Sequence, residues 1–471
     1  MHGPVEYFPP AGSLGNPSKS TESWGQSWDA EGILPPSKLP DWRWLEPVAS
    51  GEAALLADAE DGRLDDHSLL QAALIASGTV HPHQLQQCQA QFQQWVRQLQ
   101  EQKIADLQPL SRAEALFRFM HQKILTGGYD CQASDLAQTI QTGRYNCLTA
   151  CLVYHCLLEA FGIEAVGVEM PGHVRSRLRL GNQLVDVETT CPQWFELQES
   201  SGTASSTGPG EIFPLRLNLQ KDRTVQQLPL LSQPAALPEK PSADKSLLGQ
   251  PFRAETSGGE KQISPVGLVA FIYYNRGVDL LAEGRYQEAL AANAKALRLA
   301  PGHPRAWGNF LATLNNWAVF LGRSGQYPQA TELLRHGLEL APSYKPFLAN
   351  FLHVHYQWTA SLCREGRFPD AWQLLVQTAS AAPASYQPAF RAMQLELAQH
   401  WAGSLLAQGH HVQASAIWQE VRRRLGNTAD VLQAEKATWE IFVYTTGRPA
   451  AEPIPELENA MICAPLGPQM P

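Results

Sequence analysis

The stretch GRYNCLTACLVYHCLLEAFG, residues 143–162, places three cysteines on one predicted helix. Cys147 stands directly behind Asn146, at the position where this helix should begin. Unpaired backbone N–H groups and the positive end of the helix dipole meet there, and both favour a thiolate over a thiol. Cys147 is therefore the candidate nucleophile of the chain, with a carbonyl carbon as its target.

The other two cysteines of this helix, Cys151 and Cys156, lie among leucines and are interpreted as core residues. Cys151 and His155 have the i,i+4 spacing of metal ligands, but no further ligand pair accompanies them. The chain also has no P-loop, HExxH or dinucleotide fingerprint. We therefore predict neither a metal site nor a cofactor.

A cysteine nucleophile needs a base, and His173 is the candidate. It follows Pro171-Gly172 and opens a β-type segment, so the bend would aim its ring off the end of a strand. A lone histidine at a strand start is commonly structural. Here a helix-initial cysteine precedes it and an acidic pair follows it, and this context favours a chemical role.

The acid that would orient the imidazole is either Asp186 or Glu188, which alternation places on one strand face. A two-residue turn at residues 181–182 pairs His173 with Thr190. Glu188 is then a diagonal neighbour of His173, at roughly 7 Å. Asp186 would lie two diagonal steps away, roughly 13 Å along the strand. The register favours Glu188 and keeps Asp186 as the alternative.

The same register supports a competing interpretation of the two carboxylates. Arg175 would face Glu188, and Arg177 would face Asp186. Cross-strand ion pairs on a solvated face would then explain both acids without any chemistry.

Helices and a small sheet must position these residues. Residues 46–125 are predicted to be helical, with an amphipathic helix over 81–107 and another over 111–125 that begins with Ser111 as N-cap and Glu114 in a capping box. A helix from Asn146 to about Ala160 is closed by Gly162. Segments 164–170, 173–180 and 183–189 read as strands. Residues 46–200 are therefore predicted to form an α+β domain with a small antiparallel sheet.

Residues 263–448 contain a repeat. Each unit has a turn glycine, an aromatic residue or histidine two positions later, a following alanine, and a proline at its end. The glycines are Gly284, Gly325, Gly366 and Gly409, and the alanines are Ala289, Ala330, Ala371 and Ala414. The closing prolines, Pro301, Pro342 and Pro383, recur every 41 residues, and in the fourth unit Gly426 replaces the proline. Each unit predicts two helices joined by a glycine turn.

This pattern resembles the tetratricopeptide repeat, whose usual period is 34, with first helices longer by about two turns. The resemblance implies an all-α solenoid whose groove binds a protein or peptide ligand. Six tryptophans either line that groove or pack between helices: Trp307, Trp317, Trp358, Trp372, Trp401 and Trp418.

The segment from GRYNC to LVDVETT resembles the core of the transglutaminase-like superfamily, which has a papain-like fold. ALFRFMHQKILTGGYD, residues 115–130, is similar to the helix before its nucleophile. The resemblance covers about residues 105–195 and implies Cys147 as nucleophile and His173 as base. The family usually has an Asp-Pro pair where VETT stands here, which again points to Glu188 and leaves Asp186 as the alternative.

An oxyanion formed at this site would need hydrogen-bond donors. The backbone N–H of Cys147 is one candidate. The side chain of Gln141, six residues upstream, is a second.

Two functions are consistent with these features. The first is a cysteine-dependent hydrolase or acyltransferase that acts on amide or ester bonds through a Cys-His-acid triad, with the repeats recruiting a protein or peptide. The second is a non-catalytic interaction scaffold with a degenerate transglutaminase-like domain. The residues themselves do not choose between hydrolysis and transfer.

Composition limits the cellular setting. The 471 residues carry a net charge of −9, which argues against a general nucleic-acid binder. No apolar run reaches the length of a membrane span, and no signal-peptide pattern is present. Eight scattered cysteines without a CxxC pair indicate reduced thiols, so a cytoplasmic location is expected. An irregular Trp/Pro-rich segment (1–45), a linker (201–262, with a possible strand in EIFPLRLNL) and a tail (449–471) complete the predicted organisation.

Overall fold

The computed structural model describes residues 50–79, 81–170, 172–201 and 260–446. The predicted N-terminal segment, the possible strand in EIFPLRLNL and the C-terminal tail lie outside these residues. The chain divides into two compact units, Met1–Leu314 and Asn315–Pro471. The first is a mixed α/β region with a small antiparallel sheet, and the second is all-helical.

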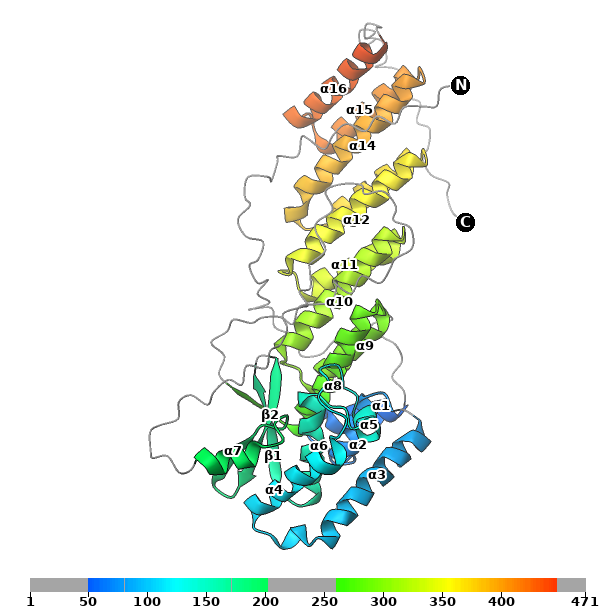
Figure 1. The fold of residues 1–471 in the computed structure, drawn as a ribbon. Helices are drawn as coiled ribbons and strands as arrows, with labels where there is room; N and C mark the ends of the chain where they lie inside the picture. The colour runs from blue at the N-terminus through cyan, green and yellow to red at the C-terminus, as the bar shows by residue number, and fades with distance from the viewer. Residues whose placement is uncertain (1–49, 80, 171, 202–259, 447–471) are drawn as a thin grey trace. The chain divides into compact units, whose positions relative to one another are not determined.

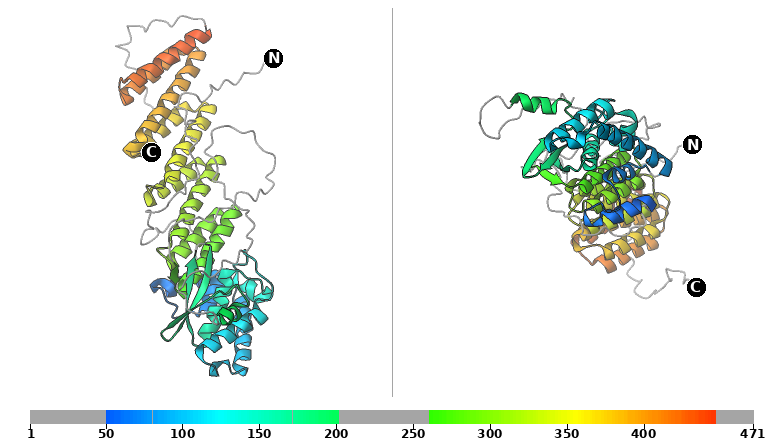
Figure 2. Two further views of the ribbon diagram at one scale, coloured as in Figure 1. Left: turned by 60° about the vertical axis from the view of Figure 1, so that its left-hand side comes forward. Right: turned by 90° about the horizontal axis from the view of Figure 1, so that it is seen from below.

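The first unit is built around a central buried helix, α6. The sheet packs on one side of α6, while α2, α4 and α5 pack elsewhere on its surface (Figures 1 and 2). The helices of this unit are α1 (Ser50–Asp58), α2 (Leu69–Ala76), α3 (Pro82–Glu101), α4 (Pro109–Phe119), α5 (Leu136–Thr142), α6 (Cys147–Ala160), α7 (Trp194–Ser201), α8 (Pro265–Ala282) and α9 (Tyr286–Leu299), with short turns η1 (Ala59–Asp61) and η2 (Ile104–Asp106).

Helix α4 begins earlier than predicted. Its first residue is Pro109, with Gln108 as N-cap, so Ser111 lies inside the helix and the predicted capping box is wrong. A proline is well suited to the first helical position, because its fixed φ is helical and it lacks an N–H that would be unpaired there anyway. The helix runs into a π-helical turn, η3 (Met120–Ile124), instead of continuing as α-helix to residue 125.

The sheet has the strand order β3-β2-β1-β4, with antiparallel pairing of β1 (Glu164–Met170), β2 (His173–Leu180), β3 (Gln183–Val187) and β4 (Lys261–Ile263). The register pairs Leu180 with Gln183 and Ser176 with Val187, which confirms the two-residue turn at 181–182. Strand β3 ends at Val187, two residues before the predicted end. Strand β4 belongs to residues that the sequence assigned to the linker and the start of the repeats.

One face of β2 is buried against α6. Val174, Ser176 and Leu178 are almost inaccessible, while the alternate residues of the strand are partly exposed. Helix α6 itself is buried along nearly its whole length. This packing explains why its sequence shows little amphipathic pattern.

The first helix pair of the predicted repeats belongs to the first unit. Helix α8 contacts α2, α6 and β1, and α9 contacts α1. Buried Glu52 of α1 accepts hydrogen bonds from the Tyr273 hydroxyl (3.2 Å) and from Lys295 Nζ (2.7 Å). A buried carboxylate requires such partners, so this pairing fixes α1 against α8 and α9.

The second unit is formed by α11 (Tyr327–Leu340), α12 (Lys345–Arg364), α13 (Phe368–Ala381), η5 (Ala384–Tyr386), α14 (Gln387–Ala407), α15 (His411–Leu425) and α16 (Ala429–Thr446); α10 (Pro304–Arg323) spans the division. The turn glycines of all four predicted pairs have a positive φ, between 74° and 81°. The alanine of each second helix is fully buried. The helix–glycine turn–helix units are therefore present, and their assignment to the tetratricopeptide class stays a prediction.

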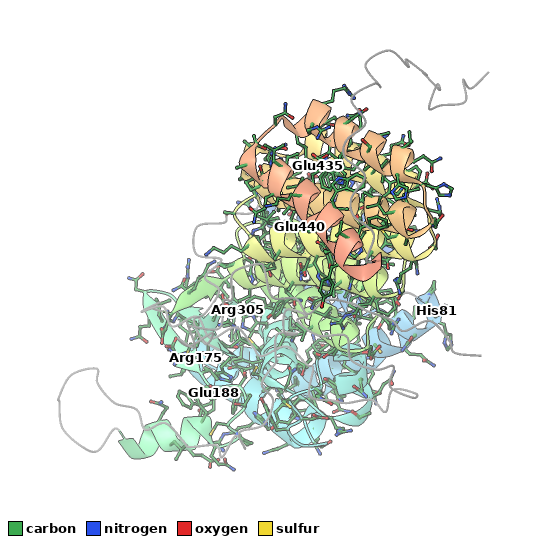
Figure 3. All side chains as sticks on the ribbon, turned by 90° about the horizontal axis from the view of Figure 1, so that it is seen from above. His81, Arg175, Glu188, Arg305, Glu435 and Glu440 are labelled. Atoms are coloured by element: carbon green, nitrogen blue, oxygen red, sulfur yellow. The ribbon has the colours of Figure 1, made fainter. Side chains whose placement is uncertain are left out.

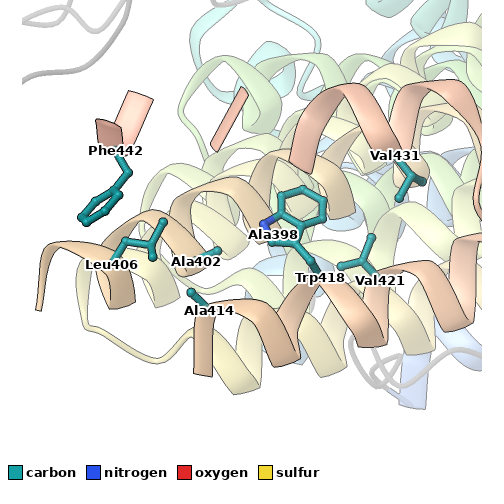
Figure 4. Packing of buried hydrophobic residues seen from close by; sticks show 8 residues of the cluster. All are labelled: Ala398, Ala402, Leu406, Ala414, Trp418, Val421, Val431 and Phe442. Carbon is teal, nitrogen blue, oxygen red and sulfur yellow. The ribbon is translucent and has the colours of Figure 1, made fainter. Parts of the chain in front are cut away.

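Aromatic contacts repeat along the second unit. Tyr327 stacks on Trp358 (centroids 6.1 Å apart) and Phe368 stacks on Trp401 (6.2 Å). Trp418 is fully buried in the cluster of Figure 4, with alanines of α14 and α15 around it. Trp307, in α10, is also buried, so these two tryptophans pack between helices and line no groove. Among the described residues, no helix combines the length and apolarity that a bilayer crossing requires.

Candidate active site

Cys147 is the first residue of α6, and its thiol is partly exposed. Asn146 caps the helix: its side chain accepts from the Thr149 backbone N–H (2.9 Å), and Thr149 Oγ1 accepts from the Asn146 N–H (3.0 Å). This reciprocal pair is a capping box with threonine in place of the usual acid or amide. It holds the thiol at the end of the helix, as the sequence predicted.

The approach to Cys147 depends on two glycines in contact. The Gly127 N–H donates to the Gly143 carbonyl (2.9 Å), and Gly143 has a φ of 73°. A Cβ on Gly127 would lie 2.5 Å from the Thr142 carbonyl oxygen, which real structures do not tolerate. Because the two glycines touch, the segments that follow them run side by side, and Tyr129 and Tyr145 form a parallel β-bridge. Asn146 and Cys147 follow directly.

His173 interacts with both of its proposed partners. It opens β2, and its Nε2 lies 2.7 Å from Glu188 Oε2. The Cys147 thiol is close enough to the same ring to raise its pKa. Glu188 is a carboxylate and can only accept, so the ring donates through Nε2 and leaves Nδ1 for the sulfur. Burial lowers the pKa of His173, but Cys147 and Glu188 outweigh it and raise that pKa to about 10.

Glu188 is held at both oxygens. Oε2 accepts from His173, and Oε1 accepts from the Thr190 backbone N–H (3.0 Å) and hydroxyl (2.6 Å). Burial acts to raise the pKa of Glu188, but hydrogen bonds from His173 and Thr190 and the charge of His173 lower it overall. The carboxylate is therefore ionised and fixed in orientation at neutral pH.

Asp186 has different partners. Its carboxylate is bound by Arg175 Nη2 (2.7 Å) and by Arg177, whose Nη2 lies 2.8 Å from Oδ2. The Arg177 hydrogen bond lowers the pKa of Asp186. The predicted pairing of Arg177 with Asp186 is present, whereas Arg175 binds Asp186 in place of Glu188. The structure thus brings Glu188, and not Asp186, to His173.

The amide of Gln141 has a partner outside the proposed triad. It is exposed near the end of α5, and its amide is directed at Cys88 Sγ of α3, 4.0 Å away. The backbone N–H of Cys147, at the first position of α6, has no acceptor within the helix and remains available.

Three residues that support the site were not identified from sequence. Thr190 anchors Glu188, although its place opposite His173 in the register was a usable signal. His121, in η3, is partly buried, and burial lowers its pKa to about 4 against an opposing effect of the Thr189 backbone beside Glu188. Burial, with Cys147 and Glu188 nearby, raises the pKa of Tyr129 to about 12. Its hydroxyl therefore stays protonated at neutral pH, and no sequence pattern marks this residue.

A second group of polar side chains on α6 is buried away from solvent. Ser176 Oγ lies 3.2 Å from Cys151 Sγ and 3.0 Å from His155 Nε2, and all three side chains are buried. Burial raises the pKa of Cys151 to about 12 and lowers that of His155 to about 4. These groups satisfy one another inside the α6–β2 interface and act as polar core residues.

Comparison with known proteins agrees with this part of the chain. Residues 86–190 match the family model described as Transglutaminase-like superfamily. No curated protein and no solved structure gives a match. The matched range begins inside α3, ends three residues beyond β3 and contains Cys147, His173 and Glu188.

Proposed function

We propose that this protein is a cysteine-dependent hydrolase or acyltransferase that acts on amide or ester carbonyls through Cys147, His173 and Glu188. One observation carries the proposal: a single imidazole is hydrogen-bonded to an oriented carboxylate and lies beside a helix-initial thiol that raises its pKa. Asp186 is occupied by two arginines, so Glu188 is the acid. The family match over residues 86–190 supports the same chemistry.

His173 supplies the proton of the first step. Its pKa is raised to about 10, so the ring is an imidazolium at neutral pH, and Cys147 reacts as the thiolate, the nucleophilic form of a cysteine. Cys147 Sγ then attacks the carbonyl carbon, and the carbonyl π-electrons move to oxygen. His173 gives its Nδ1 proton to the departing amine or alcohol, and a thioester remains on Cys147.

The second half of the reaction regenerates the thiolate. Neutral His173 removes a proton from water or from an amine, which attacks the thioester carbon and expels the sulfur. Water completes hydrolysis, and an amine completes transfer. Glu188 keeps the Nε2 proton in place throughout, so Nδ1 always faces the sulfur.

The oxyanion of each tetrahedral intermediate needs fixed donors. The backbone N–H of Cys147 provides the first, at the positive end of α6. We assign the second to the hydroxyl of Tyr129 in place of the amide of Gln141, because Tyr129 is bridged to Tyr145, two residues before Cys147, whereas Gln141 is directed at Cys88.

Alkylation and acylation together test this function. Iodoacetamide should label Cys147 selectively well below pH 8, as followed by mass spectrometry of the proteolytic peptides, and p-nitrophenyl acetate should leave a transient acetyl group on Cys147. Cys131, which is exposed and lies before the same helix, is the matched control thiol. Uniform slow labelling of all cysteines, with no acetyl adduct on Cys147, would leave only the scaffold function.

The repeats are proposed to recruit a protein or peptide. A cavity of about 180 Å³ opens beside α11 and α12 and is lined by Tyr327, Tyr356, Arg323 and Arg364 among others. Aromatic and cationic side chains together suit a peptide with apolar and acidic residues. A peptide-display selection on the full chain should enrich such sequences. The enrichment should fall for R364Q and persist for R335Q, which alters an exposed arginine of α11.

A further inference from the structure

A pair of arginines extends along β2 from the candidate active site. Arg175 and Arg177 stand two and four residues beyond His173, on the face of the strand opposite to the one buried against α6. Their side chains are only 19% and 17% exposed. Figure 3 labels Arg175 and Glu188 among the described side chains.

Two carboxylates occupy this pair. Asp186 reaches it from the adjacent strand β3 and is itself partly buried. Glu260 reaches it from the residue just before β4, with Oε2 2.8 Å from Arg177 Nη2 and Oε1 bound to Arg175 Nη2. The side chain of Glu260 is 42% exposed and is thus the most accessible member of the cluster.

The charges of the cluster indicate that Glu260 is the carboxylate that a ligand could replace. Two guanidinium groups meet two carboxylates, so the loss of Glu260 from the cluster would leave a net positive charge and uncover N–H donors on both arginines. Asp186 is held by strand pairing along β3, whereas Glu260 is attached to the end of a three-residue edge strand. Arginine donors arranged in this way match the two oxygens of an incoming carboxylate.

We propose that Arg175 and Arg177 form a carboxylate-binding subsite beside Cys147, and that Glu260 occupies it as an intramolecular stand-in for part of the substrate. The inference rests on the proposed function and specifies its substrate class: acyl compounds that carry a carboxylate a short distance from the reacting carbonyl. Strand rise places Arg175 roughly 7 Å and Arg177 roughly 13 Å from His173. Those lengths fit an acidic side chain or a short acidic peptide.

Matched alkylating reagents test the subsite without a known substrate. N-iodoacetyl derivatives of glycine, β-alanine and γ-aminobutyrate are compared with their carboxamides, and the rate of labelling at Cys147 is measured for each at constant ionic strength. The carboxylate-to-carboxamide rate ratio, divided by the same ratio for free glutathione, measures recognition of the carboxylate. We expect a ratio above one for at least one spacer length in the wild-type chain.

Variants of the cluster should move this ratio in opposite directions. E260Q vacates the subsite and should raise the ratio, by about tenfold if a single charge-assisted contact is gained. R175Q and R177Q should lower it to the glutathione value. R175K keeps the positive charge without the paired donors and should give an intermediate ratio. R179Q is the matched control, because Arg179 lies on the same strand but is 60% exposed, and it should leave the ratio unchanged.

The outcomes separate the two proposals. Slow labelling of Cys147 by the carboxamides at pH 6 would refute the proposed function, and the ratio can still be measured at pH 9. Fast labelling with a ratio that neither E260Q nor R175Q changes would overturn the subsite. A lower melting temperature of E260Q with an unchanged ratio would show that Glu260 only anchors β4.

Discussion

Replacing Glu188 with glutamine tests the site at its most specific contact. The substitution keeps the shape of the side chain and removes its charge. Glu188 Oε1 accepts two hydrogen bonds from Thr190, and Oε2 accepts one from His173. An amide has only one acceptor oxygen, so it cannot satisfy both sides.

Either orientation of the glutamine is costly. With its oxygen toward Thr190, the NH₂ group faces His173 Nε2 and forces the ring proton onto Nδ1, where a neutral ring cannot accept a proton from Cys147. With its oxygen toward His173, the NH₂ group meets the Thr190 N–H. A hydrogen bond to a charged group contributes about 1.5–3 kcal/mol and a neutral one about 1 kcal/mol, so the imidazolium loses about 0.5–2 kcal/mol.

That loss sets the expected rate. Because 1.4 kcal/mol corresponds to a factor of ten, iodoacetamide should alkylate Cys147 of E188Q about 2- to 30-fold more slowly than wild type at pH 6. D186N is the matched control: it removes the same charge from the same strand region, but Asp186 binds Arg175 and Arg177. Its rate should stay within about threefold of wild type. Equal rates for E188Q and D186N, with melting temperatures showing both folded, would refute the assignment of the acid.

Further predictions concern the frame around the site. His155 is buried and its pKa is lowered to about 4. Between pH 6.5 and pH 4 this histidine is therefore protonated in the unfolded chain but neutral in the folded one. The unfolding free energy consequently falls as the pH is lowered from 6.5, by about 2 kcal/mol at pH 5. Denaturant unfolding of wild type and H155Q at pH 7 and pH 5 should show this loss in the wild type only. Gly127→Ala should destabilise the first unit and slow alkylation of Cys147, because the new Cβ would lie 2.5 Å from the Thr142 carbonyl oxygen. The control is Gly308→Ala, which adds a Cβ to a helical position with open space around it. This control should raise the melting temperature or leave it unchanged. Asn146→Ala removes the N-cap of α6 and should cost about 1 kcal/mol in unfolding free energy; an unchanged denaturation midpoint would show that the cap contributes nothing.

Local signals in the sequence predicted the parts of the site that lie close together along the chain. Asn146 before an apolar run marks the start of α6, and the Gly181-Asn182 turn sets the register that brings Glu188 near His173. Both features act within a few residues, where turn geometry and capping decide the conformation. Local signals misplaced element ends, as at α4, where Pro109 set the helix start in place of Ser111.

Contacts between distant segments could not be read in the same way. The pairing of β4 with β1, the contact of Glu260 with Arg175 and Arg177, and the ion pair between Glu52 and Lys295 each join residues far apart in the chain. No periodicity specifies such contacts, since they depend on which surfaces meet after the elements pack. The same limit explains why His121 and Tyr129 were not identified from sequence.

The amino-acid sequence by itself therefore determined the candidate nucleophile, the base, the preferred acid and the helical pairs of the second half. The tertiary structure decided which carboxylate contacts His173, which binds the arginines, and where Gln141 is directed. The physical reason is that strand alternation places Asp186 and Glu188 on one face with equal chemistry. The register favours Glu188, and the three-dimensional positions of Thr190, Arg175, Arg177 and Glu260 give each acid its own partners.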